Sequence, residues 1–247
     1  STLTQASITS DAGEFTFDID DSESNVIIET TGQYFSEVRG DIEGDITLSS
    51  IVEINGNNEL HNTNLLTTLT RLRIQALMND GMAIQTAIST AESELLAALS
   101  PLLPTLNSPS RFAGSLLISR RQQNSDLDSN AYLLALSSVF DQLAQSRALA
   151  NNDSAAANMG LLIESVANDL AINGELTNSA VMNELINAMT ELNPDQVLLN
   201  LFLLDSELES VASASDLSAC EVLLGELTCA DDSGQNQNIT SIIANLN

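Results

Sequence analysis

The spacing of hydrophobic residues changes near residue 60 of the chain. In the segment EFTFDI, residues 14–19, apolar and polar positions alternate, and this period of two is typical of half-buried strands. In the segment 65–98, apolar residues instead recur every three to four positions, which indicates amphipathic helices. The pattern therefore predicts an α+β protein, with a small antiparallel β-sheet domain over residues 1–58 and a larger all-α helical bundle over residues 59–247.

The β part is predicted to contain about five short strands, fewer than the seven or so of a sandwich fold. The strand segments are TLTQASIT, EFTFDI, NVIIETT, QYFSEV and DITLSSIVEI, and Gly32 is expected to separate the third from the fourth. The turn-rich NGNN at residues 55–58 marks their end. We therefore expect a partial sandwich, whose sheet either packs directly on the helices or leaves an open edge for another strand.

Capping and turn residues set the boundaries of the first two predicted helices. Asn62, Thr63 or Asn64 is expected to cap a helix that ends at Asp80-Gly81. A second helix is predicted to run antiparallel to it and to end before Pro101. The polar residues of the first helix are expected to face solvent or neighbouring helix caps; they are Thr67, Thr68, Thr70 and Gln75.

Further helices are predicted beyond Pro101, and polar residues again set their ends. Asn173-Gly174 is expected to end one of them, and Asn193 to cap another whose first residue is Pro194. The segments 205–228 and 238–246 are also predicted to be helical, with a polar loop between them. The other expected starts are Asp128 or Ser129, the segment NNDS at 151–154, and Thr177 or Asn178.

The charge of the chain is strongly negative, with 34 acidic residues, seven Arg, no Lys and a net charge of −27. Such a field repels phosphate backbones and anionic lipid surfaces, which argues against nucleic-acid and peripheral membrane partners. Solubility in a salty medium is the favoured interpretation, and a surface bridged by divalent cations is the alternative. No stretch reaches the roughly 18 apolar residues of a membrane-spanning helix, and the start at Ser1 without a signal peptide is expected for a mature or trimmed form.

The two cysteines, Cys220 and Cys229, are close in sequence. A disulfide between them would close a loop of about ten residues and stabilise the fold by roughly 2–3 kcal/mol. Such a local pair suits an oxidising compartment, and two unrelated buried thiols are the alternative.

Few residues of the chain suggest catalysis. His61 is the only histidine, it lies in a polar turn, and no G-x-S-x-G elbow accompanies it. Without a Gly-rich phosphate loop or a Lys, no nucleotide cofactor is expected. We therefore predict no catalytic and no cofactor-binding residue, although a glycosidase-like carboxylate pair is not excluded by composition.

Acidic runs are the candidate metal ligands, because Ca²⁺ prefers carboxylate oxygens. The first run follows a predicted strand and consists of Asp18, Asp20, Asp21 and Glu23. A second run consists of Asp41, Glu43 and Asp45, and a weaker one includes Asp231 and Asp232. None of them matches the EF-hand loop, so a solvated acidic hairpin is the alternative to a Ca²⁺ site.

Three segments together resemble a pattern of bacterial secreted and surface lipoprotein-like proteins: DAGEFTFDI, VIIETTGQYFSEVRG and NTNLLTTLTRL. In that family a carboxypeptidase-regulatory-like β-sandwich carries a "dGxFxfdi" strand and a "vevtGgxYxd" strand, and a helical part opens with "vTPLTtla". The resemblance covers roughly residues 10–100, and more faintly LAINGEL at 170–176. This chain has Asn64-Leu65 where the family has Thr-Pro. The resemblance implies an exported protein and its fold rather than an activity.

Three classes of function remain open: a structural or assembly protein, a binding module of a larger surface protein, and an enzyme of unrecognised type. The first is favoured, as a non-enzymatic protein of the bacterial cell surface or medium, with the periplasm as an alternative location. Its expected partner is another copy or a neighbouring surface protein. The segment Ser1–Thr9 alternates and lacks charge, so it would serve as a donor strand for a neighbour's open edge and build a filament. The alternative is that it folds back as a hairpin on its own EFTFDI strand.

Overall fold

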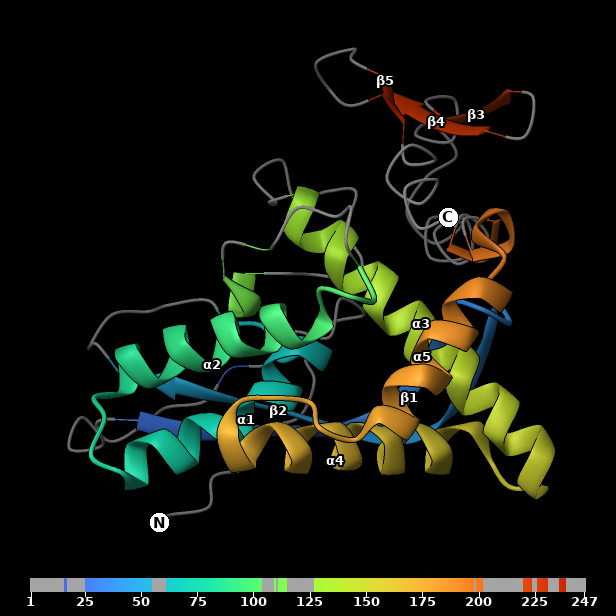
Figure 1. Cartoon of the computed structure of the whole chain (residues 1–247). Helices are drawn as coiled ribbons and strands as arrows, with labels where there is room; N and C mark the ends of the chain where they lie inside the picture. Colours follow the sequence, from blue (N-terminus) through green and yellow to red (C-terminus); the bar gives the residue numbers. More distant parts are fainter. Residues whose placement is uncertain are drawn as a thin grey trace.

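The computed structural model describes residues 16, 25–54, 61–103, 109, 111–114, 127–197, 199–201, 220–223, 226–230 and 236–238. A two-stranded ribbon is followed by helices (Figure 1). The strands are β1 (Asn25–Ser36) and β2 (Asp41–Glu53). The helices are α1 (Leu65–Asn79), α2 (Ile84–Leu99), η1 (Phe112–Gly114, a 3-10 turn), α3 (Leu127–Asn151), α4 (Ala155–Asn173) and α5 (Ser179–Glu191). Of these, α1, α2 and α4 run roughly along the ribbon, while α3 and α5 lie obliquely to it (Figure 1). Residues 194–197 and 199–201 are helical too, and we call them the 194–201 helix.

The ribbon is one long antiparallel hairpin. Asn25 pairs with Glu53 at one end and Ser36 with Asp41 at the other. The prediction that Gly32 separates two strands is wrong, because Gly32 pairs with Ile46 and the ladder continues through it. An irregularity occurs between Gln33 and Phe35, where the register shifts. An unbroken partner strand keeps the glycine in extended backbone, despite its weak preference for strands.

Helix α1 docks its first turn against the ribbon. Asn64 is its N-cap, and a reciprocal capping box with Thr67 confirms one of the three predicted caps. The helix ends at Asn79 with Asp80 as its C-cap, and Gly81 comes next with a φ of +91°, in agreement with the predicted end at Asp80-Gly81. The expectation that the polar residues of this helix face solvent or helix caps is wrong for Thr68 and Thr70, which are buried. Thr68 contacts the backbone of β2, and Thr67 both completes the capping box and bonds to β2.

Other local signals of helix ends are confirmed at α4, α5 and the 194–201 helix. The predicted start at Asp128 or Ser129 is wrong, because α3 begins at Leu127 and both residues lie inside it. Ser154 caps α4, and Gly174 ends it with a φ of +79°. Asn178 caps α5 through its side chain. The backbone N–H of Gln196 donates to Oδ1 of Asn193 at 3.2 Å, which is the predicted cap of the 194–201 helix. These signals act within one turn of chain, so the tertiary fold does not override them.

The ribbon and the helices share one hydrophobic core. Leu66, Leu95, Phe140 and Leu162, each from a different helix, are fully buried in it. Ribbon side chains pack against the same core; they are Tyr34, Val38, Ile46 and Leu48. Side chains of α1, α2 and β2 form a second, smaller cluster; they are Ile51, Ile74, Leu77, Ala87 and Ala91. The change from strands to helices falls between β2 and α1, as predicted. The division into two domains at residue 58 stays a prediction.

The predicted α+β class is confirmed at the level of an antiparallel sheet followed by mostly helical structure. In residues 25–54 the sheet consists of β1 and β2 alone, so these residues do not form the predicted partial sandwich. The predicted strands TLTQASIT and EFTFDI lie outside the described residues. No helix among the described segments combines the length and the apolar character needed to cross a bilayer.

A second sheet lies near the C-terminus, where the sequence predicted helices. Its antiparallel strands are β3 (Cys220–Leu223), β4 (Glu226–Ala230) and β5 (Asn236–Asn238). The helix prediction over 205–228 is therefore wrong for Cys220–Leu223 and for residues 226–228 of β4, and the loop prediction is wrong for Ala230 and for Asn236–Asn238. The apolar run of this segment is short, and short runs fit a strand as well as a helix.

Candidate functional site

The outer edge of β2 is covered by the first turn of α1. The backbone N–H of Ser49 donates to Oγ1 of Thr68 at 2.9 Å. The Oγ1 atoms of Thr67 and Thr68 donate to the carbonyl oxygen of Ser49 at 2.9 and 3.3 Å. Both backbone groups of Ser49 therefore point away from β1 and are satisfied by helix side chains. A covered edge of this kind does not accept a further strand.

Strand β1 forms the opposite edge of the ribbon. Ser49 pairs with Glu29, and because Ser49 turns its backbone groups away from β1, this pair is a non-hydrogen-bonded pair of the antiparallel ladder. Glu29 and its alternate neighbours Ile27 and Thr31 therefore direct their N–H and C=O groups to the outer side of β1. No strand of the described ranges pairs with that side. We call Ile27, Glu29 and Thr31 the β1 edge; the side chain of Ile27 is 47% exposed.

The tip of the ribbon carries a buried polar cluster centred on Asp141 of α3. The hydroxyl of Ser36 donates to Oδ2 of Asp141 at 2.6 Å, and the backbone N–H of Val38 donates to the same atom at 3.2 Å. The hydroxyl of Tyr34 and Nε2 of Gln145 donate to Oδ1 at 3.2 and 3.3 Å. Asp141 has no exposed surface, so this carboxylate is fully enclosed by its donors and the core.

A second carboxyl group, that of Glu37, is buried beside the first. Its exposed fraction is 5%, and Oε1 accepts a hydrogen bond from the hydroxyl of Ser137 on α3 at 3.0 Å. Burial raises the pKa of Glu37 to about 8, and the negative charge of Asp141 adds to the increase. Burial also raises the pKa of Asp141 above its usual range, against the hydrogen bonds that it accepts. The cluster therefore favours a proton on Glu37.

The 194–201 helix holds the tip from the other side. Nδ2 of Asn200 donates to the carbonyl oxygens of Glu37 and Val38 at 2.9 and 3.0 Å. Gln196 fixes this amide by donating to Oδ1 of Asn200 at 2.8 Å. Gly40 allows the close approach, because its φ is +76° and an added Cβ would lie 2.8 Å from that oxygen. We call Tyr34, Ser36, Glu37, Asp141 and Asn200 the tip cluster.

Within the described part of the chain, the hydrogen-bond donors to the two buried carboxyl groups are all uncharged. The guanidinium of Arg39, two residues from Glu37, instead lies 3.4 Å from Asp41 and 3.7 Å from Glu43. Nε2 of Gln145 reaches Glu43 at 2.9 Å and so links this group to Asp141. Arg39 therefore forms its ion pairs with Asp41 and Glu43 rather than with the two buried carboxyl groups.

The residues predicted as sites are only partly described. Asp18, Asp20, Asp21 and Glu23, predicted as a Ca²⁺ site, lie outside the described residues, as do Asp231 and Asp232. Of the second acidic run, Asp41 and Glu43 pair with Arg39. Within the described ranges no group of three or more acidic, His or Cys side chains is placed to hold a metal ion. His61 lies just before α1 and is partly buried.

The tip cluster is not among the sites predicted from the sequence. Glu37 and Asp141 are 104 positions apart, so no local motif joins them. One signal was available: Ser137, Asp141 and Gln145 recur every four residues within a long, mostly apolar helix. Such a stripe places polar groups on one face and predicts polar partners elsewhere in the fold.

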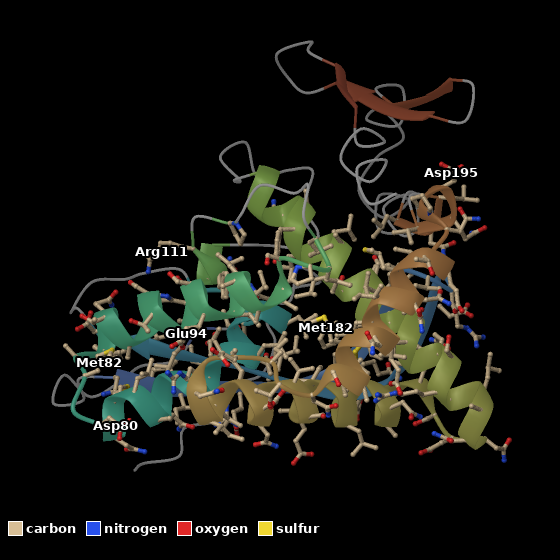
Figure 2. All side chains as sticks on the ribbon, viewed as in Figure 1. Asp80, Met82, Glu94, Arg111, Met182 and Asp195 are labelled. Carbon is tan, nitrogen blue, oxygen red and sulfur yellow. The ribbon has the colours of Figure 1, made fainter. Side chains whose placement is uncertain are left out.

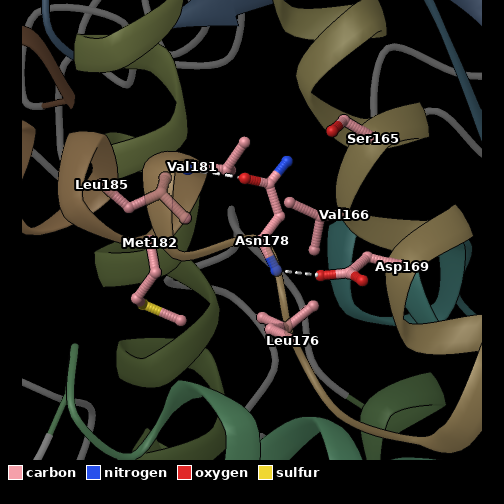
Figure 3. A pocket seen from close by; sticks show the side chains of 8 residues that line it. All are labelled: Ser165, Val166, Asp169, Leu176, Asn178, Val181, Met182 and Leu185. Carbon is pink, nitrogen blue, oxygen red and sulfur yellow. Dashed lines mark hydrogen bonds between the residues drawn. The ribbon is translucent and has the colours of Figure 1, made fainter.

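A small pocket between α4 and α5 is structural in character (Figure 3). Its carboxylate, Asp169, accepts hydrogen bonds from the hydroxyl of Thr177 at 2.6 Å and from the backbone N–H of Asn178 at 2.8 Å. These bonds lower the pKa of Asp169, and they outweigh the effect of burial, which acts in the opposite direction. Because this carboxylate fastens the turn that leads into α5, we assign the pocket no ligand.

Comparisons with protein-family models, with curated proteins and with solved structures find no match to this chain. The function of the protein must therefore be inferred from the ribbon and its surroundings.

Proposed function

We propose that this protein is a non-enzymatic structural protein, exported to the cell surface or the medium, that joins copies of itself by β-strand addition at the β1 edge. The observation that carries the proposal is the asymmetry of the ribbon. Side chains of α1 satisfy the backbone of β2 at Ser49, whereas the β1 edge has no strand beside it in the described part of the chain. An uncovered edge with an apolar residue is a template for a further strand.

The occupant that we propose is the segment Ser1–Thr9 of a second copy. This segment alternates polar and apolar residues and carries no charged side chain, so it adds no repulsion against the acidic surface. The β1 edge offers Ile27 and Thr31 as side-chain neighbours and only one charge, that of Glu29. Because donor and acceptor are different segments of each copy, such a contact need not close on itself and would extend into a filament. The added strand would also extend the ribbon toward the partial sandwich that the resemblance implies.

The charge of the chain makes this assembly dependent on salt. Two copies with a net charge of −27 each repel one another at low ionic strength. The Debye length falls from about 10 Å at 0.1 M salt to about 3 Å at 1 M, so screening removes most of that repulsion. We therefore propose that the filament forms in near-molar NaCl or with millimolar Ca²⁺, which suits a marine or saline exterior.

A disulfide between Cys220 and Cys229 belongs to the same proposal, because it suits an oxidising exterior. Its support is the strand register, in which Cys220 of β3 lies directly opposite Cys229 of β4. Directly opposed residues of an antiparallel pair have Cα atoms about 4.5–5.5 Å apart, and a disulfide spans about 4.4–6.8 Å.

The test compares two substitutions at Glu29 with a deletion of residues 1–9. Proline at this position, Glu29→Pro, removes the outward N–H while leaving the ladder to β2, and Glu29→Gln keeps the N–H. Light scattering and electron microscopy of the full chain in 1 M NaCl with 5 mM CaCl₂ should show filaments for wild type and Glu29→Gln. The deletion and Glu29→Pro should show monomers.

A full-length protein that stays a monodisperse monomer at high concentration under these conditions would refute assembly. The binding-module alternative would then take its place, since the same edge would accept a strand from a different surface protein. Filaments that persist in Glu29→Pro would place the contact elsewhere. Loss of the monomer's own stability in the deletion variant would indicate that Ser1–Thr9 pairs within its own chain.

A further inference from the structure

We propose that Glu37 and Asp141 form a proton-operated latch, which holds the tip of the β1–β2 ribbon against α3 and the 194–201 helix while the pair carries a proton and loosens the tip when that proton leaves. The proposal goes beyond strand addition and concerns the opposite end of the ribbon. It depends on the geometry of the tip cluster, where three parts of the chain meet around two buried carboxyl groups.

The hydrogen bonds of the turn converge on this pair. The backbone N–H of Gly40 closes the turn by donating to the Ser36 carbonyl at 2.8 Å. The turn is then fastened to α3 through Ser36 and Val38, whose donors both reach Oδ2 of Asp141. It is fastened to the 194–201 helix through Asn200, which bonds to the Glu37 and Val38 carbonyls. Movement of residues 36–39 away from α3 would break the bonds of Ser36 and Val38 to Asp141 together.

Among the described residues, the charges that face the pair come from the ribbon and α3. The ribbon contributes Tyr34, Arg39, Asp41 and Glu43, and its one described cation is shared by the last two. Helix α3 contributes Asp141 itself, with neutral Ser137 and Gln145 beside it. The 194–201 helix contributes two neutral amides, Asn200 and Gln196. Near Gly44, α4 contributes the uncharged methyl group of Ala156, 3.1 Å from an ideal Cβ position at that glycine.

One proton decides whether this arrangement is favourable. Two ionised carboxylates buried side by side repel one another, and each loses its hydration. With a proton on Glu37, the donors at Asp141 face a single negative charge that they satisfy well. Asp141 accepts four hydrogen bonds and Glu37 accepts one from a side chain, so the proton belongs mainly to Glu37. The raised pKa of Glu37 agrees with this assignment.

The direction of the pH effect follows from the difference between the pKa of Glu37 in the closed tip and in an opened tip. In an opened tip, Glu37 would titrate near its ordinary pKa of 4.5, whereas in the closed tip its pKa is about 8. The latch is therefore at full strength below about pH 4.5, weakens as the pH rises through 8, and changes little above that. In the limit of complete coupling, the opening constant rises about tenfold for each pH unit across this interval.

Hydrogen exchange tests the latch in the full-length protein. Amide protection of residues 36–40 is measured by mass spectrometry from pH 5 to pH 9, corrected for intrinsic exchange and compared with the core of α4 over 162–170. Wild type should lose at least tenfold of tip protection relative to α4 between pH 5.5 and pH 8. Glu37→Gln, which cannot ionise, should show constant relative protection. The matched control Asp45→Asn, on an exposed residue of the same ribbon, should behave as wild type.

Two outcomes would overturn the latch. The first is a wild-type tip whose relative protection is independent of pH. The second is a pH dependence that survives in Glu37→Gln, since the titrating group would then lie elsewhere. If Glu37→Gln does not fold, carboxyl ¹³C NMR of Glu37 in wild type decides, because a midpoint near 4.5 would refute the proposal. Light scattering at each pH checks that the protein is monomeric during the exchange measurement, so that the test of the latch does not depend on the proposed assembly.

Discussion

Replacing the hydroxyl of Thr68 by a methyl group, as in Thr68→Val, tests how α1 covers the β2 edge. Thr68 Oγ1 accepts from the Ser49 N–H and donates to the carbonyl oxygens of Asn64 at 2.6 Å and Ser49 at 3.3 Å. Both carbonyls keep another donor, because Asn64 O is bonded by the Thr68 N–H and Ser49 O by Thr67 Oγ1. The substitution therefore leaves one group without a partner, the N–H of Ser49, a residue that is 3% exposed.

The expected cost follows from that single orphaned donor. A buried polar group without a partner lowers the free energy of unfolding by about 1–3 kcal/mol. Valine and threonine differ little in helix propensity, so the helix itself contributes almost nothing to the difference. In a chain of this size each kcal/mol lowers the melting temperature by about 2–4 °C.

Thr70→Val is the matched control on the same helix. Thr70 is buried at 1% exposure, and its hydroxyl donates to the carbonyls of Leu66 and Thr67 within the helix. Those carbonyls keep their helical hydrogen bonds, so this substitution should cost less than about 1 kcal/mol. Urea unfolding followed by circular dichroism measures both variants. Equal losses for Thr68→Val and Thr70→Val would refute the idea that α1 covers the β2 edge through specific hydrogen bonds.

Three further predictions concern other parts of the chain. Intact mass before and after reduction and alkylation should show the Cys220–Cys229 disulfide; two thiols alkylated in unfolded, unreduced protein would rule it out. Gly174→Ala should destabilise by about 1–3 kcal/mol, because φ is +79° and the new Cβ would collide with the Glu94 carboxylate that pairs with Arg73 (Figure 2). Gly81→Ala is the control, because Gly81 has a φ of +91° and no atom lies within 4 Å of the added Cβ, so only the backbone strain remains. It should lower the free energy of unfolding by about 1–2 kcal/mol. A larger decrease for Gly81→Ala than for Gly174→Ala would contradict the collision with Glu94. The melting temperature should rise from low to near-molar NaCl, and a flat or falling curve would contradict screening; a Ca²⁺ effect well beyond ionic strength would instead favour the predicted site at Asp18, Asp20, Asp21 and Glu23.

Local signals in the sequence predicted the helix ends other than the start of α3, because the physics of those ends is local. Asn64, Asn178 and Asn193 each accept from an N–H within three residues, whatever the rest of the chain does. The prediction for Thr68 of α1 was wrong because its surroundings are not local. Those surroundings are set by β2, about 19 residues earlier in the chain. The sequence of a helix does not show that one of its hydroxyl groups will pair with the backbone of a strand edge.

The tip cluster shows the same difference over a longer distance. Glu37 lies in a turn whose sequence suggests a solvated acid, and Asp141 lies beside the apolar face of α3. Only the packing of the ribbon against α3 brings them together. The residues around each of them in the sequence do not indicate that its hydrogen-bond partners are uncharged. The prediction for the C-terminal strands was wrong for another reason, since a short apolar run around Val222 has too few residues to distinguish a period of two from one of 3.6.

Salt should act in opposite directions on the whole fold and on the latch. The net charge of −27 raises the cost of ionising any carboxyl group, so screening should lower the pKa of Glu37. The decrease should stay under about one unit between 0.05 and 1 M NaCl, because burial is the largest cause of the shift and salt does not enter a buried site. Carboxyl ¹³C NMR of Glu37 at the two salt concentrations measures it, with Glu29 as the exposed reference. A shift of several units would mean that distant surface charge, rather than burial beside Asp141, holds the proton. If the smaller decrease is found, near-molar NaCl raises the melting temperature while it lowers the pH at which the ribbon tip opens.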